Sequence, residues 1–340
     1  MNTTVTRRPN SGETDDLRLI WESAFGPGEV KTFFTQMFDP GRCIVAIDGG
    51  GPVAAGYLLP GGTLLAHGTS TRCAMIYAVA TLPEYRGRGY GASVVRGLVA
   101  AGRDSGFPAI VICPSEDSLF EYYSDRTGFR EWFFISERRY VSAMTSNYVA
   151  TSAEVTPDEY CRLRQVFLES TPHVVPDISV VSYQRELSRE LGGGLFRFET
   201  SVGDACAVVE WQPGGVVFAR ELLFRGPPAA GGAGYGSGCR DVEAKAIMEI
   251  ASALQAREII ARTPVWPGGR HAGNQDALSG LLREPHGPGY EKIPGIAESK
   301  VVIRRFGMLE TPGTLFAHLE SQSNTRCPGM AAPWLGFALD

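Results

Sequence analysis

The sequence predicts an α/β protein built from two domains in tandem, and three observations support this prediction. A short apolar strand, a glycine-rich turn and an amphipathic helix follow one another between residues 74 and 99. A similar order of helices, antiparallel strands, a glycine-rich loop, a helix and a strand occurs between residues 157 and 263, although no residue-level repeat is visible. The 340 residues, 44% of them hydrophobic, suffice for two domains with buried cores.

The first half begins with two short amphipathic helices that the segment 26–28 separates, and a glycine-rich turn then joins the strands of a hairpin. We expect a later helix to begin at Ser115, because serine is a favoured N-cap residue and Glu116 and Asp117 would complement the helix dipole in the first turn. The expected elements are helices at 15–25 and 28–38, strands at 42–48, 52–59, 63–71 and 74–80, a helix after residue 91, a strand at 109–113, a helix from residue 115 and a strand at 133–141.

The second half begins after the polar segment 145–157, where Thr156-Pro157 starts a new helix. Its expected elements are helices at 157–169 and 181–191, strands at 194–200, 204–211 and 215–224, a glycine-rich loop at 226–239, a helix at 241–256, a strand at 258–263, a long loop at 264–296, strands at 300–305 and 314–320, and an apolar tail at 334–339. We therefore expect a disordered tail at 1–12, a first domain at 13–148 and a second domain with a C-terminal tail at 149–340.

Composition and charge narrow the class of protein. The formal net charge is −5 with both signs interspersed, which argues against a nucleic-acid-binding protein. Seven scattered cysteines without a C-x-x-C pair argue against disulfides and zinc, and favour a reducing cytoplasm. The polar first residues do not resemble a signal peptide, and no apolar run reaches the length of a membrane span.

The glycine-rich turn has the features of a pyrophosphate site. Gly87, Gly89 and Gly91 allow a tight turn and a close approach of backbone N–H groups to a ligand. The helix start adds unpaired N–H donors and the positive end of a dipole. The Walker ending Gly-Lys-Ser/Thr is absent, whereas Ala92 fits the dinucleotide fingerprint, which is a weak signal by itself.

The segment 86–91, Arg-Gly-Arg-Gly-Tyr-Gly, resembles the Arg/Gln-x-x-Gly-x-Gly/Ala loop of the GCN5-related N-acetyltransferase superfamily. Val79-Ala80-Thr81 resembles the family's strand whose splayed end receives the pantetheine arm. Residues 119–123 with Gly128-Phe129 resemble its second signature, a helix that ends in a tyrosine before a Gly-Phe turn. The resemblance covers residues 14–145 and implies a mixed, mostly antiparallel central sheet flanked by helices, with the second half a diverged copy.

The resemblance also implies the co-substrate and its binding residues. Acetyl-CoA would be bound without a metal, and one amide N–H near residues 79–81 would meet the thioester carbonyl. The residues expected to bind acetyl-CoA are Val79, Ala80, Thr81, Arg86, Gly87, Arg88, Gly89, Tyr90, Gly91, Ala92 and Ser118.

The second glycine-rich loop is expected to be a connector. Its helix starts with Asp241 and Glu243, which already complement the dipole and would repel a pyrophosphate. The first loop has Arg86 and Arg88 and no acid in its helix before Asp104. We therefore expect one acetyl-CoA per chain.

Tyr123 is the expected general acid, because a tyrosine on the later helix commonly protonates the leaving sulfur in this family. The family usually has three residues between this tyrosine and the glycine of Gly-Phe, whereas four follow Tyr123 here, and strict counting selects Ser124. A one-residue loop extension is easily absorbed, so Tyr123 is preferred, with Tyr122 as a core aromatic.

The general base has several candidates, because the core strand 75–78 lacks the glutamate that many family members use. His67 and Glu116 also have ordinary explanations, as a strand-edge histidine and as a helix-capping acid. Glu221 lies on an apolar strand, where a buried carboxylate needs a reason. Asp340 offers a terminal carboxylate. In tandem-fold relatives of the family, such as N-myristoyltransferases and aminoglycoside acetyltransferases, the C-terminal carboxylate of the chain lies in the active site.

The sequence thus predicts an acetyl-CoA-dependent N-acetyltransferase that transfers acetyl directly to a primary amine of a small molecule or peptide. The amine would bind between the halves, with no nucleic-acid or membrane partner, and the oligomeric state stays open. Two alternatives remain: a longer-chain acyl or aminoacyl transferase of the same tandem type, and a CoA-binding sensor without catalysis.

Overall fold

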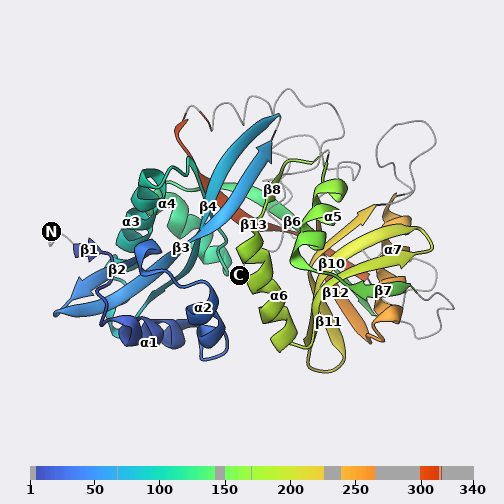
Figure 1. Cartoon of the computed structure of the whole chain (residues 1–340), viewed down its shortest axis with the longest axis horizontal. Coiled ribbons are helices and arrows are strands. Elements are labelled where there is room, and N and C mark those ends of the chain that lie inside the picture. Colours follow the sequence, from blue (N-terminus) through green and yellow to red (C-terminus); the bar gives the residue numbers. More distant parts are fainter. Residues whose placement is uncertain are drawn as a thin grey trace.

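The secondary structure divides into two halves. A computed structural model describes residues 5–66, 68–141, 150–169, 171–225, 239–264, 299–313 and 315 (Figure 1). The first half contains β1 (Val5–Arg7), α1 (Thr14–Phe25), α2 (Val30–Gln36), the 3-10 helix η1 (Pro40–Arg42), β2 (Cys43–Asp48), β3 (Gly51–Ala66), β4 (Thr69–Thr81), the 3-10 helix η2 (Pro83–Tyr85), α3 (Tyr90–Asp104), β5 (Ala109–Ile112), α4 (Asp117–Thr127) and β6 (Arg130–Val141). The second contains β7 (Thr151–Glu154), α5 (Pro157–Phe167), β8 (His173–Val175), α6 (Ile178–Glu190), β9 (Gly194–Thr200), β10 (Gly203–Gln212), β11 (Val216–Arg225), α7 (Cys239–Ala253), β12 (Glu258–Pro264) and β13 (Ser299–Glu310).

One 13-stranded sheet runs through both halves, in the order β1-β2-β3-β4-β5-β13-β6-β12-β11-β10-β9-β7, with β8 paired to β3 off this path. The topology of the first half returns in the second. Strands β1 to β4 are antiparallel neighbours followed by parallel β5, and β7, β9, β10 and β11 are antiparallel neighbours followed by parallel β12. The chain therefore has the predicted fold, a mixed, mostly antiparallel sheet flanked by helices, in which the second half repeats the topology of the first.

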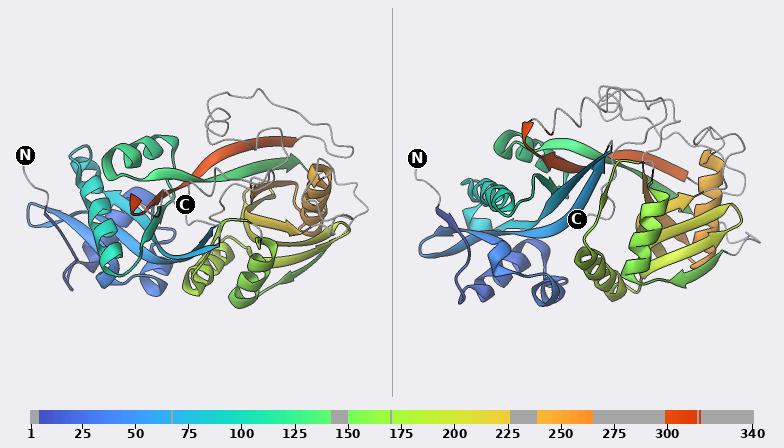
Figure 2. Two further views of the ribbon diagram at one scale, coloured as in Figure 1. Left: turned by 90° about the horizontal axis from the view of Figure 1, so that it is seen from above. Right: turned by 45° about the horizontal axis from the view of Figure 1, so that its top comes forward.

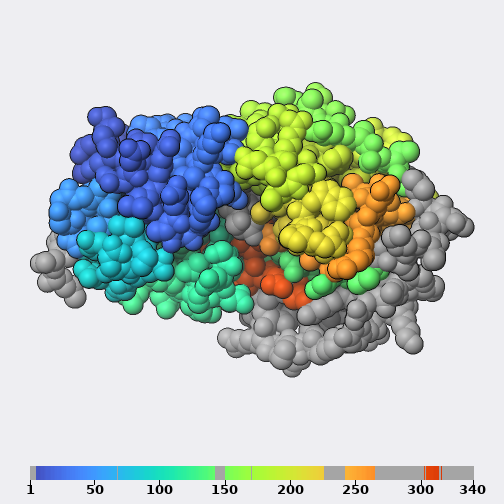
Figure 3. Space-filling view, turned by 90° about the horizontal axis from the view of Figure 1, so that it is seen from below, coloured from blue at the N-terminus to red at the C-terminus, as the bar shows by residue number. Residues whose placement is uncertain are grey.

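The two halves exchange strands at the centre of the sheet. Strand β13, from the second half, lies between β5 and β6 of the first, and β6 pairs on its other side with β12 of the second. Figure 2 shows β6 and β13 side by side along the molecule. In the space-filling view, β13 is visible between the two halves (Figure 3). Each half is thus completed by a strand of the other.

Helices cover both faces of this sheet. One apolar core joins the halves on a single face, because side chains of α1, α2, α5 and α6 belong to the same buried cluster, including Trp21, Phe33, Tyr160 and Tyr183. On the other face, α3 and α4 cover the first half and α7 covers the second, each over its own core. Burial of this continuous apolar surface is the main force that holds the halves together.

The expected elements are largely present, but the strand predicted at 63–71 is wrong. Strand β3 continues through Pro60 and Gly62, where its register with β4 shifts, so residues 63–66 belong to β3 and 69–71 to β4. Gly62 has a φ of +107°, and a Cβ there would lie 2.0 Å from the carbonyl oxygen of Val175 on β8. Gly62 lies between the two strands expected at 52–59 and 63–71, and its lack of a side chain permits the close approach of β8.

Two further expectations are corrected at helix and chain ends. Residues 5–12 are not a disordered tail, because β1 pairs with β2 and Arg7 forms an ion pair with Glu13 at 2.6 Å. Helix α4 begins at Asp117 after Glu116, so Ser115 is not its N-cap.

The helix start predicted at Thr156 is confirmed, since the Thr156 side chain accepts a hydrogen bond from Glu159 N at 3.2 Å. The glycine-rich stretch 226–238, most of the strand predicted at 314–320 and the apolar tail lie outside the described residues.

Candidate active site

Strand β4 contains a bulge near its carboxyl end. Ala55 pairs with Ala80 and Tyr57 with Tyr77, so Gly56 alone opposes two residues of β4, Ala78 and Val79. Ala78 has a φ of 48°, an uncommon value for a residue with a side chain. Bulges and such backbone strain cluster at functional sites, where they re-aim backbone groups.

The bulge lies where β4 and β5 separate. The parallel pair runs from Cys73–Ala109 to Ile76–Ile112 and ends there, whereas β4 continues to Thr81. Residues 77–81 of β4 therefore extend beyond the end of the β5 ladder. This is the splayed strand end that the sequence predicts at Val79, Ala80 and Thr81.

The glycine-rich turn follows directly and leads into α3. Gly87 and Gly89 have φ values of 78° and 85°, and a Cβ at either position would meet no atom within 4 Å. Gly89 is the N-cap of α3, so no capping side chain covers the first N–H groups of this helix. No acidic residue lies in its first turn. Unobstructed backbone N–H groups at a helix start fit a pyrophosphate.

Both arginines of the turn contribute to its conformation. Arg86 Nε donates to the Thr81 carbonyl at 3.1 Å, and an Arg88 guanidinium nitrogen donates to the Glu84 carbonyl at 3.0 Å. Asp48, at the end of β2, accepts a hydrogen bond from the Tyr90 hydroxyl at 2.7 Å and lies 3.8 Å from Arg88. Sequence reasoning missed Asp48, because no local pattern links the end of β2 to this turn.

Tyr122 of α4 reaches the start of α3. Its hydroxyl lies 3.3 Å from the place where a Cβ would stand on Gly91, and Thr81 Oγ1 lies 3.5 Å from the same place. Burial raises the pKa of Tyr122, and the backbone N–H of Ala92 opposes this rise. Strand β4, helix α3 and helix α4 thus bring a phenol and a hydroxyl to the same spot.

Tyr123 and its neighbours lie elsewhere. The Tyr123 side chain is buried in the apolar core beneath α3 and α4, and this burial raises the pKa of its hydroxyl. Ser118 is exposed one helical turn before Tyr122, so the two share a face of α4, and Ser124 is also exposed. The structure therefore places Tyr122, rather than Tyr123 or Ser124, beside the glycine-rich turn.

Glu221 is held in a buried ion pair within the second half. Its carboxylate accepts hydrogen bonds from Arg164 Nε at 3.0 Å and from the Tyr160 hydroxyl at 2.7 Å. Both Arg164 and Glu221 are almost fully buried. Strand β11 is separated from β4 in the sheet by four strands, so Glu221 is not brought to the glycine-rich turn. The reason for this buried carboxylate is its arginine partner.

The other base candidates are not brought to the turn by the described structure. Glu116 is exposed at the N-cap of α4 and makes no side-chain capping bond. His67 and Asp340 lie outside the described residues.

A polar group that sequence reasoning missed lies on the opposite side of β4. The hydroxyl of Tyr77, next to the bulge, donates to Glu29 Oε2 at 3.2 Å and lies 3.5 Å from the hydroxyl of Tyr183 on α6. Glu29 is the N-cap residue of α2. Burial raises the pKa of this carboxyl above its ordinary value. No sequence pattern joins these three residues, because they are far apart in the chain.

In the second half, β11 and the start of α7 correspond to the β4 bulge and the start of α3, but they carry different side chains. Strand β11 has one extra residue, Arg220, between the pairs Val208–Glu221 and Val209–Ala219, just after its parallel pairing with β12 ends. Near the start of α7, the buried Glu243 forms an ion pair with Arg138 of β6 at 3.2 Å. A carboxylate thus already occupies the region that α3 leaves free of acids.

In the described ranges, no group of three His, Cys, Asp or Glu residues is arranged to hold a metal ion. Every helix of the described part of the chain is too short or too polar to span a lipid bilayer.

Comparison with known proteins agrees with this geometry. Residues 5–130 match a family model described as an acetyltransferase (GNAT) domain, which includes the β4 bulge, the glycine-rich turn and α4. No curated protein matches the chain by sequence.

Several solved structures share the whole architecture. A GCN5-related N-acetyltransferase from Kribbella flavida has 17% identity and a TM-score of 0.56, over 91% of this chain and 71% of that one. One from Anabaena variabilis has 13% identity and a TM-score of 0.60, over 91% and 73% of the two chains. Eis1 from Mycobacterium abscessus has 11% identity and a TM-score of 0.55, over 92% and 75%. At these identities the similarity establishes a common fold that spans both halves.

Proposed function

Because residues 5–130 form a domain of the GCN5-related N-acetyltransferase superfamily, we propose that the chain transfers an acetyl group from acetyl-CoA directly to a primary amine. The acceptor is a small molecule or a peptide. Acyl transfer is the activity of the family, and acetyl as the acyl group and an amine as the acceptor are the specific content of this proposal.

The observation that carries the proposal is the adjacency of the β4 bulge and the acid-free start of α3. The first offers re-aimed backbone groups beyond the end of β5, and the second offers N–H donors with open space above Gly87 and Gly89. A thioester needs an N–H donor for its developing oxyanion, and a pyrophosphate needs a cluster of N–H donors and positive charge. The strand–turn–helix unit around the glycine-rich turn offers groups suited to both requirements, which supports the proposal.

Each residue of this unit has a proposed role. Backbone N–H groups of residues 87–92, with Arg86, would hold the pyrophosphate, while Val79 to Thr81 would align the pantetheine arm. Among the described residues, Arg86 donates only from Nε, to the Thr81 carbonyl, so its terminal nitrogens would be available to phosphate oxygens. Ser118 would contact the arm from α4.

Tyr122 is proposed as the general acid in place of Tyr123. Its hydroxyl lies beside Thr81 Oγ1 and Gly91, at the end of β4 that the pantetheine arm would follow, whereas Tyr123 packs in the core. The phenol of Tyr122 is protonated at neutral pH, since the ordinary tyrosine pKa is about 10 and burial raises the pKa of Tyr122. A protonated phenol there can give its proton to a departing thiolate.

Titration calorimetry with acetyl-CoA and a thiol-release assay with probe amines test the proposal together. We expect one equivalent of acetyl-CoA per chain, and amine-dependent release of CoA thiol. Binding without release for benzylamine, spermidine or a lysine-containing peptide would instead identify a CoA sensor. Faster release from octanoyl-CoA than from acetyl-CoA would identify a longer-chain acyltransferase.

A further inference from the structure

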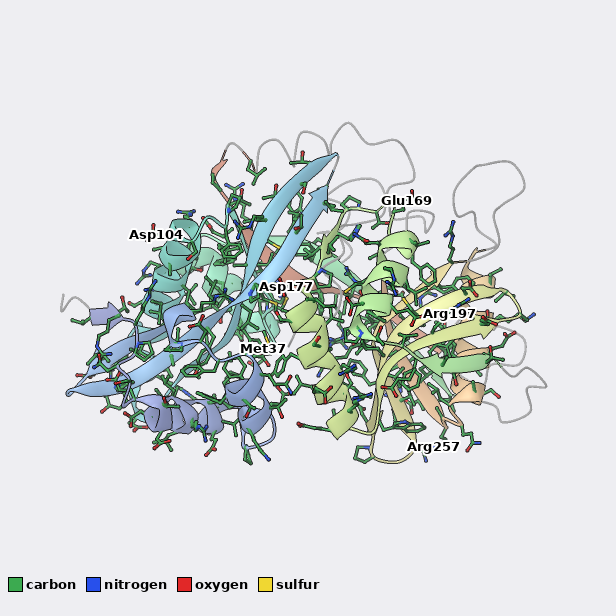
Figure 4. The ribbon with its side chains drawn as sticks, in the orientation of Figure 1. Met37, Asp104, Glu169, Asp177, Arg197 and Arg257 are labelled. Atoms are coloured by element: carbon green, nitrogen blue, oxygen red, sulfur yellow. The ribbon has the colours of Figure 1, made fainter. Side chains whose placement is uncertain are left out.

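Glu29, Tyr77 and Tyr183 meet where the two halves are in contact. The Tyr77 hydroxyl lies between the other two side chains, at 3.2 Å from Glu29 Oε2 and 3.5 Å from the Tyr183 hydroxyl. Figure 4 shows the side chains between α2 and α6, with Met37 labelled on the first-half side and Asp177 at the start of α6. Tyr77 immediately precedes the strained residue Ala78, so this group adjoins the splayed end of β4.

Glu29 forms no ion pair with another described residue, and one of its carboxylate oxygens accepts a hydrogen bond from the Tyr77 hydroxyl. The neighbouring carboxylates are engaged. Glu210 accepts from Arg220, Gln184 and Ser188, and Glu190 accepts from Thr32. A partly buried carboxylate that forms no ion pair with a described residue is costly, and such groups are frequent at sites that bind a cation or transfer a proton.

The surroundings of Glu29 include groups that raise the pKa of its carboxyl and groups that lower it. Burial raises its pKa most strongly, and the negative charges of Glu210 and Glu190 add to this. The positive charge of Arg220 and the hydrogen bond from Tyr77 lower the pKa. The outcome is a carboxyl whose pKa lies above its ordinary value, closer to the neutral range in which a general base works best.

We propose that Glu29 is the general base of the transfer reaction and that its carboxylate receives the ammonium group of the acceptor. This inference rests on the proposed function and adds to it the residue that activates the amine. It also gives the second half a part in the site, because Tyr183 of α6 contacts the tyrosine that positions Glu29.

Each transfer releases one proton to solvent. The acceptor ammonium gives one proton to the Glu29 carboxylate and becomes a neutral amine. The nitrogen lone pair forms the C–N bond to the thioester carbonyl carbon, and the C–S bond breaks with its electron pair on sulfur. The nitrogen loses a second proton to solvent, and the thiolate takes a proton from Tyr122, which solvent restores. Glu29 then releases its proton to solvent, so the net products are an amide, CoA thiol and one proton.

Tyr77 and Tyr183 are positioning residues in this scheme. Tyr77 donates to Glu29 and fixes one carboxylate oxygen, so the other is left for the ammonium group. The Tyr183 hydroxyl lies within reach of the Tyr77 hydroxyl and holds it in this orientation. Since a donor to the charged carboxylate lowers its pKa, loss of Tyr77's hydroxyl raises the pKa of Glu29.

The first test compares Glu29→Gln with the wild type in the full chain, using whichever of benzylamine, spermidine and a lysine-containing peptide the wild type acetylates. We expect unchanged acetyl-CoA affinity by calorimetry and a turnover about a hundredfold lower near neutral pH. The acidic limb of the kcat/KM profile should move from the pKa of the Glu29 carboxyl to that of the acceptor ammonium, because the variant can use only the amine that is already neutral. Glu22→Gln, on the exposed side of α1, is the control for a lost acidic charge nearby.

The second test separates base positioning from packing. Tyr57 pairs directly with Tyr77 across β3 and β4 and is equally buried, but its hydroxyl has no hydrogen-bond partner among the described residues. Tyr77→Phe should move the acidic limb to higher pH by about 0.5–1 unit, the equivalent of one lost hydrogen bond. Tyr57→Phe should leave that limb in place.

The outcomes distinguish this inference from the proposed function. If the wild type acetylates an amine and Glu29→Gln keeps both its rate and its pH profile, Glu29 is not the base, while the proposed function stands. If the wild type binds acetyl-CoA but acetylates none of the probes, the proposed function fails and the inference falls with it. A shift of the acidic limb in Glu29→Gln to the pKa of the acceptor ammonium, with intact acetyl-CoA binding, supports both.

Discussion

Tyr122 and Tyr123 are neighbours on α4 with ring centroids 5.2 Å apart, but their side chains lie in different surroundings. The hydroxyl of Tyr122 reaches Gly91 at the start of α3, and Tyr123 packs in the apolar core with Phe129. This difference follows from the helical period, because successive residues point about 100° apart. It decides which phenol can meet a ligand at the glycine-rich turn.

Tyr122→Phe should therefore lower the transfer rate by about a hundredfold or more, the usual size of a general-acid contribution. Acetyl-CoA affinity should change little, since the ring that lines the site remains. Steady-state kinetics and calorimetry measure the two quantities separately. Tyr123→Phe is the matched control, and a loss of turnover in that variant, with Tyr122→Phe fully active, would restore Tyr123 as the acid.

Gly89→Val should abolish acetyl-CoA binding in a protein that still folds. The site has open space for a Cβ, so the effect comes from the φ of 85°, which a β-branched residue adopts only at a cost of about 1–3 kcal/mol. The turn would relax to another conformation, and its N–H groups would no longer converge on the pyrophosphate.

Gly106→Val is the control for this strain, because Gly106 lies just beyond the other end of α3 with a φ of 79°. Both variants should lose a similar amount of thermal stability. Only Gly89→Val should lose the calorimetric signal for acetyl-CoA, and equal affinities in the two variants would show that the pyrophosphate site is misplaced.

His173 should make the folded state less stable in mild acid. The side chain is buried on β8, with Nδ1 at 2.7 Å from the Thr171 carbonyl oxygen, and Nε2 has no partner among the described residues. Burial, and then the positive charge of Arg164, lower its pKa in the folded protein. Below the ordinary histidine pKa of about 6.5 the unfolded chain binds this proton more readily than the folded chain. The free energy of unfolding should thus fall as the pH decreases from about 6.5 to the lowered folded-state pKa.

Urea unfolding of the wild type and His173→Asn between pH 5 and 8 isolates this contribution, since asparagine keeps a donor for the Thr171 carbonyl. The difference between the two free energies should slope by at most about 1.4 kcal/mol per pH unit within that window, and be flat above it. A difference that is constant from pH 5 to 8 would show that His173 titrates normally.

Glu221→Gln should destabilise the second half strongly without altering acetyl-CoA affinity. The substitution leaves Arg164 buried without its counter-ion, which typically costs about 3–5 kcal/mol. Glu199→Gln breaks an exposed pair with Arg197 and should cost less than about 1 kcal/mol. Chemical denaturation measures both. A Glu221→Gln protein of normal stability that cannot acetylate would indicate a catalytic role.

Local patterns explain most of the predicted elements. The strand–turn–helix unit around Gly87 and Gly89 could be predicted because its glycines, its arginine and its apolar period lie within one short stretch. Strand β13 was expected only in part, at 300–305, and its place between β5 and β6 was not foreseen, because strand order depends on contacts between distant segments. The separate strands expected at 52–59 and 63–71 are one strand, β3, for the same reason. Its register shift between Pro60 and Gly62 lies where β8 packs against it, and no local pattern predicts that contact.

The sequence by itself determined the order of most helices and strands in both halves, the glycine-rich turn and the family resemblance, because these depend on residues close together in the chain. Only the tertiary structure decided which tyrosine of α4 meets that turn, that Glu221 pairs with Arg164, and that Glu29 lies against Tyr77 with no ion-pair partner among the described residues. Tyr77 and Glu29 are 48 residues apart, and Tyr77 and Tyr183 are 106 apart. Such contacts exist because burying apolar surface brings the two halves together, and no local propensity encodes which polar groups then meet.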